Sequence, residues 1–210
     1  MAAGEGGRTL IVWRHGETNH NASGIWQGQL DIALSHKGRE QALKAAAALT
    51  SYRPSLIVSS DLQRAADTAR SLADRLDVQV RYDQRLREIH AGVWQGKTAG
   101  DVAEQFPLEQ AALLAGEDIR RGVHGETLGQ VAERTHEALQ ALLANLPAGE
   151  TAVIATHGVA GRAAVAGLVG LDQHLAWRTF AGLRNCHWAE LREYAGAWRI
   201  VAWNVGTDSV

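Results

Sequence analysis

Two histidines and two arginines follow apolar runs of the sequence, and together they have the chemistry of an anion site. Three runs precede them: Thr9 to Trp13 before Arg14 and His15, Ser55 to Ser60 before Arg64, and Thr151 to Thr156 before His157. A guanidinium donates paired hydrogen bonds to a phosphate, and a helix N-terminus adds backbone N–H groups and a favourable dipole. A lone histidine after a strand is usually an ordinary surface residue, so the prediction depends on all four lying together.

They lie together only if the runs are strands of one sheet. The runs are apolar throughout rather than alternating, which is typical of strands covered on both faces. Helical patterns separate them: one is capped by Ser35, one begins at Asp61, and an amphipathic one runs from Leu128 to Leu142. We predict an α/β fold, a three-layer sandwich whose mainly parallel central sheet is flanked by helices, with a C-terminal hairpin at Ala195-Gly196. Ligands of such sheets bind beyond the carboxyl ends of the strands.

Length and composition limit the class of protein. The chain has 210 residues, 46% hydrophobic, and a formal net charge of −2. This balance argues against nucleic acid or a membrane surface as partner. With one cysteine, no signal peptide and no apolar run near about 18 residues, we predict a cytoplasmic protein.

We expect a disordered stretch over residues 1–7, one domain over residues 8–206 and a tail over residues 207–210. Coil with a short helix near Thr98 to Gln105 is expected between Arg85 and Gly125.

Four stretches of the chain resemble a known family. They are "RHGET" after the first strand, "SSDLQRAADTA", "LREIHAGVWQG", and "THG" after a late strand. In this order, over nearly the whole chain, they are similar to the histidine phosphatase superfamily, also called phosphoglycerate mutase-like. The resemblance implies a sheet flanked by helices, a phosphohistidine intermediate, and neither cofactor nor metal.

The resemblance also implies roles for individual residues. His15 matches the nucleophile, and Glu88 matches the general acid that protonates the leaving group and then activates water. Further catalytic residues, matching the phosphate pocket, are Arg14, Arg64 and His157. Residues expected to line the phosphate or substrate side are Asn21, Gln27, Gly28 and Gly158.

These roles agree with the chemistry of the residues themselves. A histidine nucleophile must present an unprotonated ring nitrogen, and neighbouring positive charges oppose its protonation. Its other ring nitrogen needs an acceptor to hold the tautomer. The resemblance implies that this acceptor is a nearby backbone carbonyl, and we expect it to be that of Gly16. Phosphoryl transfer depends mainly on positioning and charge stabilisation, which fixed guanidiniums supply.

Other kinds of protein fit the sequence less well. "GVWQGKT" resembles a nucleotide-binding P-loop, but Ala91 stands where that loop needs glycine. His15 and His20 are five residues apart, which suits no single helical face of a metallohydrolase. A module that only binds phosphate would not need the complete catalytic set. A cofactor-dependent phosphoglycerate mutase is the remaining alternative; such mutases carry Arg and Tyr near the acid and a lysine at the position of Ala99, so we predict a phosphatase.

The substrate is predicted to be a small phosphorylated metabolite, either a sugar phosphate or a phosphoglycerate derivative. "NCHW" and "WRI", with the other motifs, resemble the actinobacterial group of the family that acts on glucosyl-3-phosphoglycerate. Trp26 and Trp94 are candidates for stacking on a sugar, with packing equally open. His124 is expected at the pocket mouth, in contact with substrate. The tryptophan-rich hairpin near the C-terminus suggests either a sheet edge or a homodimer contact.

The letters HGET occur twice, and their flanks differ. The first copy, from His15 to Thr18, follows a strand and contains the nucleophile. The second, from His124 to Thr127, follows coil and begins the amphipathic helix. There Thr127 and Gln130 have the spacing of a capping box, so we predict a helix cap rather than a second site.

Overall fold

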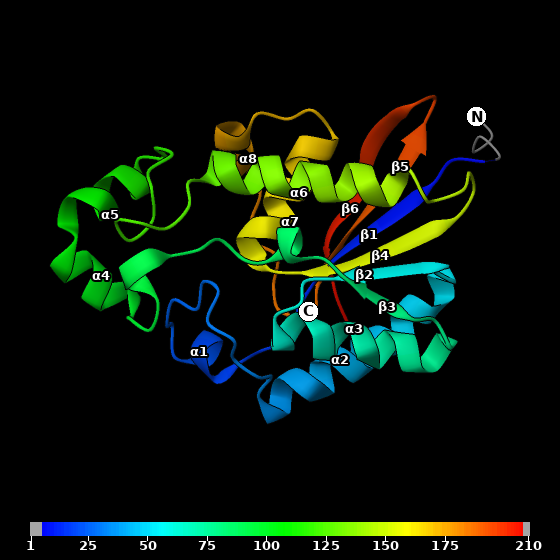
Figure 1. The fold of residues 1–210 in the computed structure, drawn as a ribbon, viewed down its shortest axis with the longest axis horizontal. Helices are drawn as coiled ribbons and strands as arrows, with labels where there is room; N and C mark the ends of the chain where they lie inside the picture. The colour runs from blue at the N-terminus through cyan, green and yellow to red at the C-terminus, as the bar shows by residue number, and fades with distance from the viewer. Residues whose placement is uncertain (1–5, 208–210) are drawn as a thin grey trace.

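Six strands form one sheet at the centre of the molecule (Figure 1). The computed structural model describes residues 6–207. Its strands are β1 (Thr9–Arg14), β2 (Leu56–Ser59), β3 (Val80–Tyr82), β4 (Thr151–Thr156), β5 (Trp188–Tyr194) and β6 (Ala197–Val205). Their order is β3-β2-β4-β1-β5-β6, in which the first four are mutually parallel and the hairpin β5–β6 is antiparallel. The predicted fold class and the C-terminal hairpin are confirmed.

Helices cover both faces of this sheet and extend beyond one end of it (Figure 1). They are α1 (Asn19–Ala22), α2 (His36–Leu49), α3 (Gln63–Leu76), α4 (Ala99–Gln105), α5 (Pro107–Leu114), α6 (Leu128–Leu143), α7 (Gly158–Leu168) and α8 (Gln173–Thr179). Alternate residues of β1 explain its continuous apolar run. Leu10 and Val12 pack towards α6 and α7, whereas Ile11 and Trp13 pack towards α2 and α3. A strand buried on both faces needs apolar residues at every position.

The register of the parallel strands brings their carboxyl ends to one edge. Arg14 pairs with Thr156 across β1 and β4, and Ser59 pairs with Ala155 across β2 and β4. The residues that follow these strands therefore begin from adjacent points of the sheet, as the sequence predicted.

The segment between β3 and α6 is more helical than predicted. Beyond the expected helix near Thr98 to Gln105, α5 continues from Pro107, a residue suited to the first turn of a helix. Phe106 and Leu113 pack with Trp94 and Val102 in a small separate core, which accounts for the extra helix. Helix α8 was also not predicted.

Helix α3 begins later than predicted. The N-cap is Leu62, which has no side-chain cap, and the helix starts at Gln63. Asp61 instead accepts two hydrogen bonds from Arg87, at 2.7 and 2.5 Å. A part-buried ion pair with this geometry satisfies the carboxylate better than a helix terminus does, because two charge-assisted bonds replace one dipole interaction.

Both HGET copies end in a helix cap. The capping box of Thr127 and Gln130 at the start of α6 is confirmed. In the first copy Thr18 also caps a helix, the short α1, and forms a capping box with Asn21. Capping therefore does not distinguish the two copies; what distinguishes them is the strand that precedes the first.

The ends of the predicted domain division lie partly outside the structure. Of the stretch expected to be disordered, only residues 6 and 7 are described, and of the tail only residue 207. Within residues 6–207, every helix is too short or too polar to span a lipid bilayer.

Candidate active site

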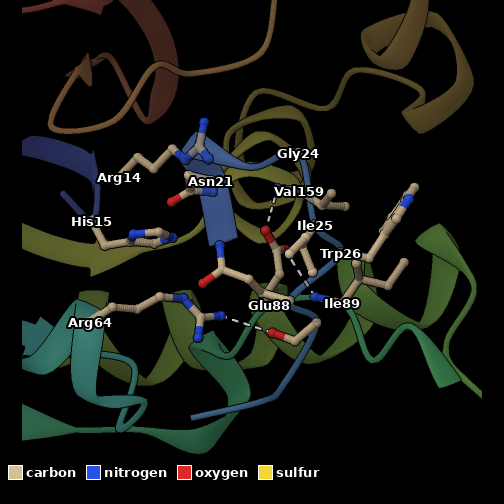
Figure 2. Close-up of a pocket in the computed structure, with 12 residues that line it drawn as sticks. Arg14, His15, Asn21, Gly24, Ile25, Trp26, Arg64, Glu88, Ile89 and Val159 are labelled. Atoms are coloured by element: carbon tan, nitrogen blue, oxygen red, sulfur yellow. Dashed lines mark hydrogen bonds between the residues drawn. The ribbon is translucent and has the colours of Figure 1, made fainter. Parts of the chain in front are cut away.

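A cavity of about 210 Å³ opens at the carboxyl edge of the sheet. Its two sides differ in character, as Figure 2 shows: Arg14, His15 and Arg64 lie on one side, and Trp26 and Ile89 on the other. The remaining lining residues are Asn21, Gly24, Ile25, Gln27, Gly28, Glu88 and Val159. The cavity thus combines a basic inner part with a largely apolar outer part.

His15 is buried and held in one tautomer. Its Nδ1 lies 2.6 Å from the carbonyl oxygen of Gly16, the acceptor expected from the sequence. An N–H at Nδ1 leaves Nε2 unprotonated, as a nucleophile requires. Burial, and then the charges of Arg64 and Arg14, lower the pKa of His15 well below 6.5. The ring is therefore neutral at physiological pH.

Close backbone packing shapes the turn that carries His15. A Cβ on Gly16 would lie 2.3 Å from the carbonyl oxygen of Gly38 in α2, so any larger residue would push the turn away from the helix. The Gly16 N–H donates to Thr68 Oγ1 of α3 at 3.1 Å. The turn after β1 is thus held against α2 and α3.

The guanidinium of Arg64 is buried and that of Arg14 is half-buried, and both retain unused donors. Arg64 donates to the carbonyls of Leu30 and Gly28 at 2.7 and 2.8 Å, and Arg14 donates to Leu183 at 2.6 Å. The Nε atoms of both arginines are buried with no hydrogen-bond partner among residues 6–207. Burial lowers the pKa of Arg64 to about 10, so it remains charged at neutral pH. Buried donors without partners are uncommon and fit an anion bound between them.

His157 lies beside His15. The two imidazole centroids are 5.1 Å apart in an edge-to-face arrangement. Its Nε2 contacts Ser60 Oγ at 2.8 Å, while its Nδ1 is buried and has no partner among the described residues. Burial, and then the charge of Arg64, lower the pKa of His157 well below 6.5. His157 borders the site but is not among the residues that line the cavity.

Glu88 lies in the middle of the cavity (Figure 2). Its carboxylate accepts backbone N–H groups of Ile89, Val159 and Ala160 at 2.9, 3.2 and 3.1 Å. The last two belong to the first turn of α7, so the helix N-terminus holds the acid in place. Gly158 lies beside both groups: a Cβ on it would make ordinary van der Waals contacts, 3.6 Å from Arg14 Cζ and 3.7 Å from Glu88 Oε2. Val159, rather than Gly158, lines the cavity.

The remaining predicted residues fall into two groups. Asn21, Gln27 and Gly28 line the cavity, and the Gly28 carbonyl also anchors Arg64. His124 is exposed and outside the lining residues; its ring packs against that of His90, with centroids 5.9 Å apart. The structure therefore does not bring His124 into the site.

The two tryptophans have different roles. Trp26 is half-buried and lines the outer part of the cavity, whereas Trp94 is fully buried behind it, with ring centroids 5.3 Å apart. Trp94 belongs to a turn of 3-10 helix, Gly92–Trp94, inside the stretch that resembles a P-loop. A buried indole fills the space that a phosphate cradle would need.

One important residue had no recognisable signal in the sequence. Arg134 of α6 donates to the carbonyls of Arg85 and Arg87, both at 2.7 Å, and to that of Glu88 at 3.0 Å. It also pairs with Glu126, which accepts the N–H of His90 at 2.8 Å. In the sequence, Arg134 looks like any solvated arginine on the polar side of an amphipathic helix.

In the part of the chain that the structure describes, no cluster of three or more His, Cys, Asp or Glu side chains is arranged to hold a metal ion. The predicted site is built instead from one nucleophilic imidazole, two guanidiniums and one carboxylate.

The chain resembles one protein family over nearly its whole length. Residues 10–206 match the model of the histidine phosphatase superfamily, branch 1. The chain is 38% identical to glucosyl-3-phosphoglycerate phosphatases of Mycolicibacterium vanbaalenii and Mycobacterium tuberculosis, covering 96% of this chain and of each relative. A probable phosphoglycerate mutase of Erwinia tasmaniensis is 32% identical, over 94% of this chain and 91% of the relative.

A solved structure of mycobacterial glucosyl-3-phosphoglycerate phosphatase with VO3 has the same fold. It superposes with a TM-score of 0.87 at 37% identity, covering 95% of this chain and all of the other. A family match over nearly the whole chain thus accompanies a buried, neutral His15 between two guanidiniums. The chain belongs to the histidine phosphatase superfamily.

Proposed function

We propose that this protein is a metal-independent phosphomonoesterase acting on a small phosphorylated metabolite, with His15 as nucleophile and Glu88 as general acid and base. One observation carries the proposal: His15, neutral and with Nε2 unprotonated, lines the same cavity as Arg14, Arg64 and Glu88. The arginines supply positive charge where the phosphoryl group passes through its transition state.

The reaction has two balanced steps. In the first, His15 Nε2 attacks phosphorus, the bond to the leaving alkoxide breaks, and protonated Glu88 gives its proton to that oxygen. In the second, Glu88 takes a proton from water, whose oxygen attacks phosphorus; the P–N bond breaks, and phosphate and neutral His15 result. A carboxyl group that acts in this way contributes about 10²–10⁴-fold to the rate.

The surroundings of Glu88 favour hydrolysis over mutase chemistry. After the acid, Ile89 contributes apolar surface to the cavity, whereas mutases of the family carry a charged residue there. The position of the mutase lysine is taken by Ala99, the first residue of α4. A mutase must also hold a second anionic group of its substrate while the substrate turns, and these positions offer no cation for it.

We propose glucosyl-3-phosphoglycerate as the substrate. The relatives with 38% identity are named for this activity. The outer part of the cavity supports it, because Trp26, Ile25 and Val159 present apolar surface beyond the basic part. A sugar ring has apolar C–H faces that stack on an indole, so Trp26 would bind the glucosyl group while the arginines bind the phosphate.

A kinetic comparison of substrates tests this assignment. Glucosyl-3-phosphoglycerate, 3-phosphoglycerate and p-nitrophenyl phosphate are compared by kcat/KM, each with and without a chelator. We expect the glucosyl compound to be the best substrate and the chelator to have no effect. Trp26→Ala should lower kcat/KM for the glucosyl compound about 10-fold and leave 3-phosphoglycerate within about twofold, as expected from the loss of one buried contact surface. A higher kcat/KM for 3-phosphoglycerate would refute the substrate, and formation of 2-phosphoglycerate would indicate a mutase.

The nucleophile is tested with His15→Ala. The wild-type protein should form an acid-labile phosphoenzyme after rapid quenching with ³²P-labelled substrate, and the variant should form none. His36→Ala is the matched control, because the His36 side chain is 83% exposed on α2. Hydrolysis by His15→Ala at a rate near that of the wild type would refute the mechanism.

Two further properties belong to the same proposal. We propose a cytoplasmic enzyme whose single cysteine stays reduced, and one catalytic domain over residues 8–206.

We also propose a homodimer formed along β6, the outer strand of the sheet, where Val201 is 49% exposed. Sedimentation velocity at micromolar concentration should report a dimer, and Val201→Lys should shift it towards monomer; a wild-type monomer would refute this contact.

A further inference from the structure

Asn185 lies beside the nucleophile although it is far from it in sequence. It belongs to "NCHW", a stretch to which the reaction proposed above gives no role. Strand β5 follows this stretch and runs antiparallel to β1, with Trp188 opposite Trp13. The loop before β5 is therefore placed at the carboxyl end of β1, where His15 begins its turn.

One amide group joins two residues of the site. Asn185 Nδ2 donates to the backbone oxygen of His15 at 3.1 Å and to Asn21 Oδ1 at 3.2 Å. The next residue strengthens the same contact, since the Cys186 N–H lies 3.1 Å from the carbonyl oxygens of Arg14 and His15. The loop thus holds the backbone of the nucleophile and the side chain of Asn21 at once.

These contacts determine the orientation of the Asn21 amide. Asn21 Oδ1 also accepts the backbone N–H of Thr18 at 3.2 Å. A backbone N–H can only donate, so the atom it contacts must be the amide oxygen. With Thr18 and Asn185 both donating to this oxygen, the amide nitrogen is the end left over, and it makes no hydrogen bond to any other described residue. Asn21 lines the cavity, so this nitrogen is a donor available to a phosphoryl oxygen.

We infer that Asn185 is a positioning residue for phosphoryl transfer, which turns the Asn21 amide so that its N–H groups meet the phosphoryl oxygens beside His15. Asn21 Oδ1 also accepts the Thr18 hydroxyl at 3.1 Å, so without the Asn185 donor the amide keeps its two contacts to Thr18. It loses the contact that joins it to the loop before β5, and with it part of the restraint on its orientation. A donor that must reorient during the reaction stabilises the transition state less than one held in place beforehand. The inference rests on the proposed phosphatase activity, but it holds for any phosphomonoester substrate.

A double-mutant cycle tests the inference. Asn185→Ala, Asn21→Ala and the double variant are compared by kcat/KM for p-nitrophenyl phosphate and by the inhibition constant of orthovanadate. We expect Asn21→Ala to lower kcat/KM about 10²-fold, the effect of losing one donor to the transition state. Asn185→Ala should lower kcat/KM about 10-fold and weaken vanadate in parallel, yet change either quantity less than about twofold in the Asn21→Ala background.

The control is Arg184→Ala, because Arg184 is the exposed neighbour of Asn185 and makes no side-chain hydrogen bond within residues 6–207. Its kinetics should match the wild type. If Asn185→Ala does not fold, Asn185→Ser replaces it, since a serine hydroxyl is too short to reach both acceptors.

Two results would overturn the inference: wild-type kinetics and vanadate affinity in Asn185→Ala, or the same fold-loss with and without Asn21. Failure of the proposed function has a different signature. A wild-type protein that hydrolyses the aryl ester but not the glucosyl compound refutes only the substrate. A wild-type protein without any hydrolase activity refutes the function. The role of Asn185 is then decided by measuring vanadate binding to the wild type and to the three variants of the cycle by calorimetry.

Discussion

The Glu88 carboxylate is positioned by the backbone alone. Three N–H groups donate to it, and two of them belong to the start of α7. No side chain of residues 6–207 hydrogen-bonds to the carboxylate itself, so its orientation depends on the start of α7 and on the backbone of its own segment. In the proposed mechanism, such a group acts on the leaving oxygen without a further entropic cost for ordering the side chain.

We predict that Glu88→Gln separates good from poor leaving groups. The variant cannot donate or accept the transferred proton, so the rate of phosphoryl transfer from an alkyl phosphate should fall about 10²–10⁴-fold. A p-nitrophenolate leaving group needs no proton, so its release in the first turnover should fall much less. Stopped-flow measurement should then reveal a burst of nitrophenolate followed by slow turnover. An equal loss for both ester types, with no burst, would contradict the role of Glu88.

At the scale of elements, α6 holds the segment that carries Glu88. Arg134 donates to the backbone carbonyls of Arg85, Arg87 and Glu88. Glu126 accepts the N–H of His90. The irregular segment from Arg85 to His90 has few backbone bonds of its own, so a guanidinium from a neighbouring helix replaces them. The second HGET copy thus contributes to the site indirectly, through its glutamate.

We predict that Arg134→Met lowers kcat about 10-fold or more while KM changes less than about threefold. Methionine is unbranched and keeps the apolar character of the arginine stem, but it removes every donor, so the Glu88 segment loses its anchor. Misplacement of a reacting group by about 1 Å costs up to 10²-fold. Glu133→Gln is the control on the exposed side of the same helix. Steady-state kinetics are measured well below the melting temperature of each variant, so that a loss of kcat caused by misplacement of Glu88 is separated from a loss caused by unfolding. A lower melting temperature with unchanged kcat would contradict the positioning role.

At the scale of the whole molecule, helices cover both faces of the sheet, and the site opens to solvent at one edge of it. This burial keeps His15 and His157 neutral, and burial is the first cause of the lowered pKa of each. Function and stability are therefore linked. The imidazoles of His15 and His157 are neutral in the folded protein, as the proposed catalysis requires, and they bind protons more readily in the unfolded chain.

We predict that acidification below pH 6.5 destabilises the protein. The unfolded histidines have pKa values near 6.5, and the folded ones titrate well below that, so the unfolded state binds more protons as the pH falls. The stabilisation is complete above pH 6.5 and decreases below it, by up to about 1.4 kcal/mol per pH unit for each histidine. Urea unfolding between pH 7.5 and 5.5 measures this slope.

His157→Asn should reduce the slope by about half, and His36→Asn should leave it unchanged because His36 is exposed. Carboxylates with lowered pKa, such as Asp61, titrate below this range and do not contribute. A free energy of unfolding that stays constant from pH 7.5 to 5.5 would contradict the linkage.

The sequence by itself predicted a mainly parallel sheet flanked by helices, and the edge of that sheet where the site lies. These follow from local signals: apolar runs of strand length, caps such as Ser35 and Thr127, and polar residues directly after strands. Because parallel strands end at one edge, residues as distant as His15 and His157 could be placed together without coordinates.

Only the tertiary structure decided which side chains meet inside that edge. Trp26 and Trp94 look alike in sequence, but one lines the cavity and the other is core. His124 contacts His90 and lies outside the cavity lining, while Asn185 reaches His15 from the loop before the antiparallel strand β5. Such contacts depend on strand register and on the packing of helices against the sheet. These are set by interactions between residues far apart in the chain, and no local pattern of residue types encodes them.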